Sequence, residues 1–313
     1  MYKFSMLKIY QQTLKNPVKF SGIGLHSGKR SKITILPDQE DQGFTFKRVD
    51  LSKNNLIKAN YKNVSSAKLC TTLQNEFGIK VSTVEHLLAA LYVSEIDNAI
   101  IEIDNEEIPI MDGSAKDFIK KIDKVGIKQQ SKARKYIKVT DKTELVDGDK
   151  KISIEPCDNS FEVEFQLKYK NKLINNQKKL INFQKDDLKE VCESRTFCLF
   201  EDIEKIKKIG LAKGGSLENA LVVDEEKVLN KDGLRNENEF VNHKILDLAG
   251  DFLLSGYRVL GKVSCFQGGH QLTNSFLKKF LNSDMTHTNL EFEKVSISKN
   301  INSQQLSKLA VSA

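Results

Sequence analysis

Residues 240–256 (FVNHKILDLAGDFLLSG) place three ionisable side chains at a spacing that only a helix brings together. His243, Asp247 and Asp251 are four residues apart, so at about 3.6 residues per turn they stack along one flank of a helix. A histidine and an aspartate one turn apart form a good clamp for a borderline metal such as zinc. The spacing alone fits a solvated polar face equally well, because such faces are common.

The length and composition predict a soluble protein of two domains. The chain has 313 residues, of which 39% are hydrophobic and 29% charged, which is enough to bury a full core. No run of about 18 apolar residues is present, and lysines interrupt the amino-terminal stretch before a signal-peptide core could form. We therefore expect a cytoplasmic protein without membrane insertion.

The cysteines and the net charge narrow the classes of partner. The five cysteines are odd in number and contain no C-x-x-C pair, which argues against a disulfide framework and against a thiolate zinc knuckle. The formal charge of +7 is spread over many lysines without a basic block. This pattern favours a small phosphorylated partner and predicts no nucleic-acid surface.

The first half of the chain begins with predicted β structure. Period-two alternation predicts strands at 32–37 and 43–49. The glycines of SGIGLHSGK predict a turn between strands, because the Lys-Ser/Thr of a P-loop is missing. His26 in this turn is expected to be a surface or hydrogen-bonded side chain outside the site.

Two helices and a strand follow in the first half. Residues 82–93 (STVEHLLAALYV) predict a helix capped by Ser82 or Thr83, with Glu85 and His86 as the polar pair at its start. A buried strand is expected at 99–103. The turn at 112–114 is expected to begin an amphipathic helix that ends near residue 126.

The second half repeats this order of elements. Residues 128–135 (KQQSKARK) are the best linker candidate, so we predict domains at 1–127 and 136–313. Strands are expected at 136–139, 152–155 and 161–169. A helix at 240–254, a strand at 259–266 and a helix at 269–281 match the earlier order 82–93, 99–103 and 114–125. Duplication is the economical explanation, and it predicts two similar α+β domains that face each other.

Two further features of the second half stand apart. Residues 198–223 predict a βαβ insertion whose helix carries Ile203, Ile206 and Ile209 on one side; the alternative is a peripheral helix packed on its own sheet. His270, after two glycines, lies at the start of the last helix, where the helix dipole lowers the basicity of an imidazole unless a carboxylate compensates. Asp251 is the obvious candidate for that carboxylate.

Several blocks of the sequence, in this order, together resemble the UDP-3-O-acyl-N-acetylglucosamine deacetylase family, the zinc enzymes of lipid A biosynthesis. They are VSTVEHLLAAL, EIPIMDGSA, SRTF followed by GLAKGGSLENALVV, LNKDGLRNENEFVNHKILDLAGD, and GGH with a following asparagine. The resemblance runs from about Gly22 to the last helix. It implies two α+β domains, each a mainly antiparallel sheet with two helices, packed as a sandwich with the helices inward and a zinc site at the junction.

The resemblance also implies a role for individual residues. The zinc ligands are implied to be His86, His243 and Asp247, with Glu85 as the general base. The remaining implied groups are a paired acid formed by Asp251 and His270, a carbonyl-polarising hydroxyl on Thr196, and a diphosphate contact from Lys244.

The chemistry of such a site is consistent with these assignments. Three protein ligands leave a fourth zinc position for water, as in catalytic sites, and zinc lowers the pKa of that water to about 7. Iron(II) can occupy the same ligands. Glu85 can take the proton of the water, and the departing sugar amine needs an acid, which a cationic His270 provides.

The expected substrate, a UDP-3-O-acyl-N-acetylglucosamine, requires further contacts. Tyr169 supplies an aromatic ring for uridine, although residues 168–172 read KYKNK where many family members have an Asp-Phe or Asp-Tyr followed by His-Pro. The fatty acyl chain needs an apolar passage, which we expect from the insertion. The other expected contacts to the substrate are Phe197, Ile203, Ile206 and Gly214.

Two other functions remain open at this point. A zinc amidohydrolase for a different acylated amino sugar would keep the same catalytic residues. A non-catalytic nucleotide-sugar binding protein would need neither a general base nor an open metal position, so Glu85 counts against it. We expect the protein to act as a monomer.

Overall fold

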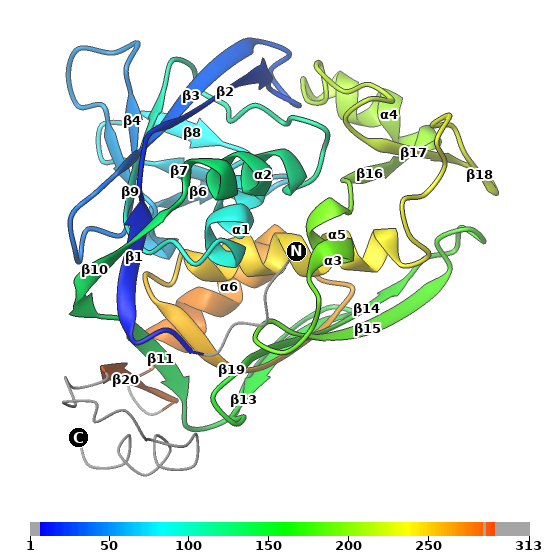
Figure 1. The fold of residues 1–313 in the computed structure, drawn as a ribbon. Coiled ribbons are helices and arrows are strands. Elements are labelled where there is room, and N and C mark those ends of the chain that lie inside the picture. The colour runs from blue at the N-terminus through cyan, green and yellow to red at the C-terminus, as the bar shows by residue number, and fades with distance from the viewer. Residues whose placement is uncertain (1–6, 284–285, 292–313) are drawn as a thin grey trace.

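The structure is a computed structural model that describes residues 7–283 and 286–291, and its fold is mixed α+β and rich in sheet (Figure 1). Residues 1–6, part of the stretch that argues against a signal peptide, and residues 292–313 of the predicted second domain lie outside the described residues. In the described part of the chain, no helix is both long and apolar enough to cross a membrane.

The first half of the chain builds a five-stranded sheet in the order β2-β3-β9-β4-β5. Neighbouring strands are antiparallel except β4 and β9, which run parallel. These strands are β2 (Val18–Ile23), β3 (Arg30–Pro37), β4 (Phe44–Arg48), β5 (Leu56–Lys58) and β9 (Ala99–Ile103). A short 3₁₀ helix, Tyr61–Asn63, leads into a small sheet of β6 (Val64–Ser66), β7 (Thr72–Gln74) and β8 (Lys80–Ser82).

The second half builds a seven-stranded sheet around the long strand β19 (Arg258–Phe266). The main path of this sheet is β12-β13-β19-β11-β20, and β14 also pairs with β19 in parallel. The other strands are β11 (Lys135–Val139), β12 (Thr143–Asp147), β13 (Lys150–Glu155), β14 (Phe161–Lys168), β15 (Asn176–Asn182) and β20 (His287–Glu291). A turn at residues 148–149 joins β12, which was not predicted, to β13.

The main helices lie between the strands of the two large sheets, as Figure 1 shows for α1, α5 and α6. Their bounds are α1 (Glu85–Val93), α2 (Lys116–Val125), α5 (Glu239–Leu253) and α6 (His270–Leu281); α3 (Lys189–Glu193) is a single turn. All residues of α5 except Lys244 are buried. A helix that is buried on every side belongs to the core, so its polar residues need partners inside the protein.

The predicted repetition of element order is confirmed: α1, β9 and α2 in the first half correspond to α5, β19 and α6 in the second. The expected cap of the first helix is wrong. Ser82 ends β8, and Thr83 adopts a positive φ of 58°. Its hydroxyl donates to Glu107 at 2.9 Å instead of capping the helix.

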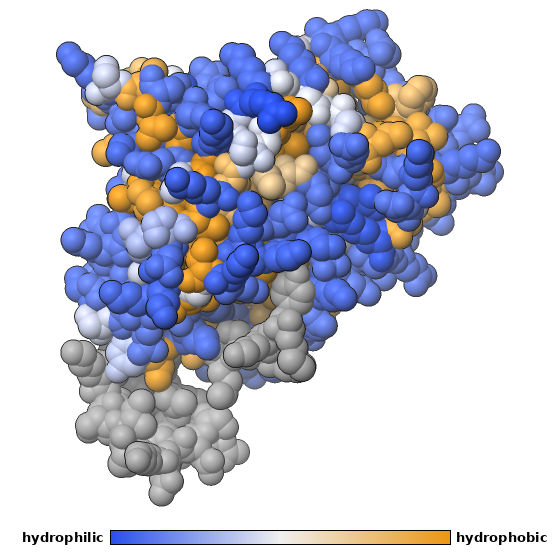
Figure 2. Space-filling model, turned by 45° about the horizontal axis from the view of Figure 1, so that its top comes forward, coloured by the Kyte–Doolittle hydropathy of each residue, from blue (hydrophilic) through white to orange (hydrophobic). Residues whose placement is uncertain are grey.

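The predicted βαβ insertion is also confirmed. Strand β16 (Phe197–Leu199) runs parallel to β17 (Leu221–Asp224), and α4 (Phe200–Lys208) connects them. A short strand, β18 (Lys227–Val228), extends this sheet. Apolar side chains gather over the insertion at the upper right of Figure 2.

Residues 128–135, expected to be an irregular linker, are mostly strand. Ile127–Ala133 forms β10, which pairs antiparallel with β1 (Tyr10–Leu14). The two strands make a ribbon in which no side chain of β10 is fully buried. Lysine and glutamine are therefore tolerated there, and the composition of a solvent-exposed strand resembles that of a linker.

Helices α1 and α5 cross closely at Gly250. A Cβ atom built on Gly250 would collide with the backbone carbonyl oxygen of Glu85. Glycine at this position therefore sets the distance between the two helices, at the cost of about 1 kcal/mol of helix propensity relative to alanine.

We expect Gly250→Ala to destabilise the protein and to weaken metal binding. The gain in propensity is smaller than the cost of overpacking, which is about 1–3 kcal/mol and here would act on backbone atoms that cannot rotate away. Thermal unfolding and zinc analysis of the purified variant measure both effects. An unchanged melting temperature together with unchanged zinc content would contradict this account of the crossing.

Candidate active site

Three buried side chains from α1 and α5 converge at the centre of the molecule. The Nε2 atoms of His86 and His243 lie 3.4 Å and 3.3 Å from the same carboxylate oxygen, Oδ1 of Asp247. One potential ligand atom from each residue lies within 4.8 Å of the others. The predicted helical spacing of His243 and Asp247 is present, and α1 adds the third side chain from the other half of the chain.

The protonation states of His243 and Asp247 suit a metal. Burial lowers the pKa of His243 to about 3, so its imidazole is neutral at pH 7. Its Nδ1 lies 3.1 Å from the carbonyl oxygen of Ser194, which can only accept, so Nδ1 carries the proton and Nε2 has a free lone pair. Burial alone would raise the pKa of Asp247, but His243 and Lys244 hold it well below its usual range.

A cation fits between these side chains. Asp247 Oδ1 is buried and has no hydrogen-bond partner, whereas Oδ2 accepts from Lys244 Nζ at 2.9 Å. A lone carboxylate oxygen that faces a neutral imidazole nitrogen bearing a lone pair is unfavourable without a positive charge between them. Two imidazole nitrogens and one carboxylate oxygen form a donor set that zinc readily accepts.

Glu85 lies beside the metal ligands without belonging to their cluster. Its side chain is buried, and burial raises its pKa. Its Oε2 accepts the backbone N–H of Thr71 at 3.1 Å, and its Oε1 lies 3.6 Å from Nε2 of His270. One oxygen is therefore anchored by the backbone, while the other lies toward His270.

The expected pairing of His270 with Asp251 is confirmed. Nδ1 of His270 lies 2.7 Å from Oδ2 of Asp251. Burial alone would lower the pKa of His270, but Asp251 and Glu85 raise it to about 10, so the imidazole is cationic at pH 7. Asp251 is held in turn by the hydroxyl of Thr71, which donates to Oδ1 at 2.7 Å.

A cavity of about 420 Å³, lined by both polar and apolar side chains, has His270 in its wall. Its wall includes five more of the predicted site residues: Tyr169, Thr196, Phe197, Ile206 and Lys244. The ammonium of Lys244 lies 5.5 Å from the centre of the Phe197 ring, and the rings of Tyr169 and Phe197 are 6.0 Å apart. An aromatic and cationic wall of this kind suits a base and a phosphate.

An apolar cavity of about 360 Å³ lies against the insertion. Ile203 and Ile206 line it as expected, together with Ala220 and Val222, but Ile209 does not and is 52% exposed. The two cavities share wall residues, namely Leu69, Thr196, Phe197, Cys198 and Ile206.

Gly214 does not lie in the wall of the apolar cavity, and Gly215 lies there instead. A Cβ atom at Gly214 would collide with the carbonyl oxygen of Gly24. Gly214 therefore permits the insertion to pack against the 24–28 turn, where its N–H donates to Leu25 O at 3.0 Å.

Two residues near the site were missed from the sequence. Thr71 connects Glu85 to Asp251, and no motif marks it. His26, expected to be a surface or hydrogen-bonded side chain, is hydrogen-bonded and buried: its Nδ1 accepts the N–H of Ala212, 3.3 Å away, and it lines the apolar cavity. A histidine in a short turn is usually exposed, and nothing local indicates that residues 212–214 cover it.

A buried cluster of two imidazoles and a carboxylate, with an acid and a base beside it, is typical of metal-dependent hydrolases. Comparison with known proteins gives a narrower assignment. The family model of UDP-3-O-acyl N-acetylglycosamine deacetylase matches residues 11–282. The chain belongs to this family.

Individual relatives match over nearly the same length. The UDP-3-O-acyl-N-acetylglucosamine deacetylase of Pseudoalteromonas translucida is 41% identical over 276 residues, which is 87% of this chain and 91% of the relative. The enzyme of the same name from Geobacter sp. is 42% identical and covers 91% of this chain and 93% of its own length. That of Shewanella halifaxensis is 42% identical, with coverages of 91% and 94%.

Proposed function

We propose that the chain hydrolyses the N-acetyl group of UDP-3-O-(3-hydroxyacyl)-N-acetylglucosamine, which releases acetate and the free sugar amine and is the committed step of lipid A biosynthesis. Membership of the deacetylase family along most of the chain supports this reaction. The observation that carries the proposal is the metal-ligand cluster of His86, His243 and Asp247 beside two buried acid–base groups.

We propose zinc as the resident metal, held by His86, His243 and Asp247. The unpartnered Oδ1 of Asp247 and the neutral imidazole of His243 support this assignment. When bound, zinc supplies Lewis acidity for the attacking water and the acetamide carbonyl. Iron(II) suits the same donors, and metal analysis of the purified protein distinguishes the two.

Glu85 is the general base. It removes a proton from water while the water oxygen bonds to the carbonyl carbon of the acetamide. The Thr71 N–H holds one carboxylate oxygen and leaves Oε1 directed toward His270 and the substrate. The raised pKa of Glu85 makes its carboxylate a stronger base than an exposed one.

His270 is the general acid, and Asp251 keeps it protonated. As the carbon–nitrogen bond breaks, His270 transfers its Nε2 proton to the sugar nitrogen, which leaves as the amine while the acyl fragment leaves as acetate. The hydroxyl of Thr196 donates to the carbonyl oxygen as negative charge develops there, and its position in the wall of the same cavity supports this role.

The two cavities divide the substrate by chemistry. Lys244 contacts the diphosphate, and Tyr169 and Phe197 offer ring faces to the uridine end. The acyl chain enters the apolar cavity along Ile203 and Ile206 of α4. Gly214 does not contact the acyl chain. It contributes indirectly, because it lets the insertion pack against the 24–28 turn.

The two halves are proposed to be domains, residues 1–127 and 136–313, arranged as a sandwich with the helices inward. Residues 128–135, largely strand β10, connect them. Because His86 comes from one half and His243 from the other, a single chain completes the site, which supports action as a monomer. The cysteines are free in the described residues, which fits a reducing cytoplasm.

Mass spectrometry of UDP-3-O-acyl-N-acetylglucosamine incubated with purified protein tests the activity directly. We expect loss of one acetyl group, inhibition by a chelator and recovery when zinc is added back. Persistence of intact substrate with zinc-loaded, folded protein would exclude this reaction.

The pH dependence of the rate is expected to be bell-shaped. Glu85 acts deprotonated, so the rate rises as the pH passes upward through a carboxyl pKa that burial raises above its ordinary value. His270 acts protonated, so the rate falls as the pH approaches its pKa, about 10 without metal and lower beside a bound cation. His270→Ala should remove the alkaline limb in a pH–rate profile, and an unchanged limb would assign the acid to another group.

A further inference from the structure

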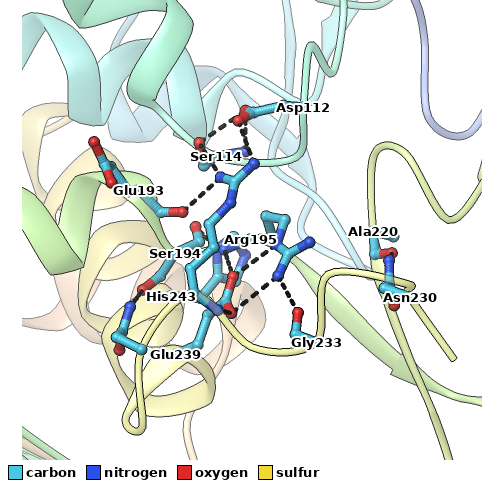
Figure 3. A network of polar contacts seen from close by, with 12 residues as sticks. Asp112, Ser114, Glu193, Ser194, Arg195, Ala220, Asn230, Gly233, Glu239 and His243 are labelled. Carbon is cyan, nitrogen blue, oxygen red and sulfur yellow. Dashed lines mark hydrogen bonds and ion pairs between the residues drawn. The ribbon is translucent and has the colours of Figure 1, made fainter. Parts of the chain in front are cut away.

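A buried cluster of polar side chains joins the start of α5 to residues 194–196 (Figure 3). At its centre is Glu239, which is fully buried. Its carboxylate accepts from Arg195 three times, from the backbone N at 3.1 Å, Nε at 2.8 Å and Nη2 at 3.2 Å, and from the backbone N of Arg235 at 2.6 Å. The four donors fit an ionised carboxylate, which only accepts, and do not fit an amide.

Glu239 and the metal ligand His243 contact consecutive residues of the same segment. The two side chains are one helical turn apart on α5, so they share a face of the helix. Glu239 holds Arg195, and His243 Nδ1 lies against the carbonyl oxygen of Ser194. Figure 3 shows Ser194, Arg195, Glu239 and His243 side by side.

The backbone around Ser194 is held on its other sides as well. The N–H of Thr196 donates to the carbonyl of Gly113 at 2.8 Å. The guanidinium of Arg235 donates to the carbonyl of Glu193 at 2.7 Å and pairs with Asp112 at 2.9 Å. The turn at 112–114, which the sequence marked without giving it a role in the site, therefore fixes this segment from the first half of the chain.

We propose that Glu239 is a positioning residue for the metal site: by fixing residues 194–196 it holds the Ser194 carbonyl where that carbonyl orients the His243 ring and keeps the proton on Nδ1. This inference rests on the proposed metal site. Partners that orient a ligating histidine typically contribute about 10–100-fold to metal affinity. Arg235 supports the same segment from its other end, through Glu193.

The substitution Glu239→Gln keeps the shape of the side chain and replaces one acceptor oxygen by an N–H donor that faces other donors. We expect zinc to bind about 10–100-fold more weakly, measured by competition with a chromophoric chelator. The tautomer of His243 is read in metal-free protein labelled with ¹⁵N-histidine. Only five histidines have to be resolved, because the chain has no more. Wild type should show His243 protonated at Nδ1, and the variant should show a mixture of tautomers.

Two further variants separate positioning from general stability. Glu95→Gln makes the same change in a partly buried cluster, in which the buried Arg134 pairs with Glu95 and Asp97; we expect a lower melting temperature with unchanged zinc affinity. Arg235→Ala alters a side chain that is 27% exposed, so it should fold even where Glu239→Gln does not, and should weaken zinc binding several-fold.

The outcomes distinguish this inference from the function on which it rests. A wild-type protein that binds no zinc overturns the proposed metal site. A wild-type protein that binds zinc, together with a folded Glu239→Gln or Arg235→Ala variant of equal zinc affinity and unchanged His243 tautomer, overturns the positioning role.

Discussion

Glu85→Gln is expected to lower the rate of deacetylation by about 10²–10⁴-fold while the protein keeps its zinc. The amide has nearly the same size as the carboxylate and can still accept the N–H of Thr71. It cannot take a proton from water at neutral pH. The loss should therefore appear in kcat, with little change in melting temperature.

His243→Ala and Asp247→Ala should behave differently, because each removes a donor from the metal cluster. We expect both variants to lose zinc during dialysis and to lose activity with it. Metal content and turnover measured on the same samples therefore distinguish a metal ligand from the general base. Glu106→Gln, an exposed carboxylate in the first half of the chain, is the matched control and should change neither quantity.

The assignment of Glu85 depends on that contrast. If Glu85→Gln lost as much zinc as His243→Ala, then Glu85 would be a ligand, and the general base would have to be another group.

The sequence predicted most reliably those features that depend on local periodicity. The spacing of His243, Asp247 and Asp251 required a helix, and α5 places them as expected. The repeated order of helix, strand and helix predicted both halves of the chain, because amphipathic spacing is a property of each element alone. The Asp251 and His270 pair followed from chemistry, since a cationic imidazole at a helix start needs a carboxylate.

Features that depend on contacts between distant segments were missed. Strand β10 could not be distinguished from a linker, because its partner β1 is more than a hundred residues away and its side chains stay in water. His26 is buried in a turn against which the distant residues 212–214 pack. The role of Gly214 reflects a close approach to Gly24, which no local pattern encodes.

Ile206→Lys is expected to raise KM strongly for a long-acyl substrate while zinc content and melting temperature stay nearly constant. Ile206 lines both cavities, at the point where the polar site meets the apolar one. No residue of α4 is fully buried, so the side chain contributes little to the core. Each acyl methylene buried in the apolar cavity is worth about 0.8 kcal/mol.

The size of the effect follows from the number of methylenes displaced. If a charged side chain keeps about four of them in water, the loss is about 3 kcal/mol, which corresponds to a rise in KM on the order of a hundredfold. A substrate with a short acyl chain should lose far less. We therefore compare KM for long-acyl and short-acyl substrates in wild type and variant. This comparison measures how much the apolar passage contributes to binding of the acyl chain.

Ile209→Lys is the matched control. The spacing of Ile209 from Ile206 predicts the same side of the helix, but the Ile209 side chain is exposed and lines neither cavity. It should leave the acyl preference intact. Suppose instead that Ile206→Lys unfolds the protein at lower temperature and keeps its preference for long chains. Then α4 packs as core, the acyl chain runs elsewhere, and the cavity beside the insertion has another use.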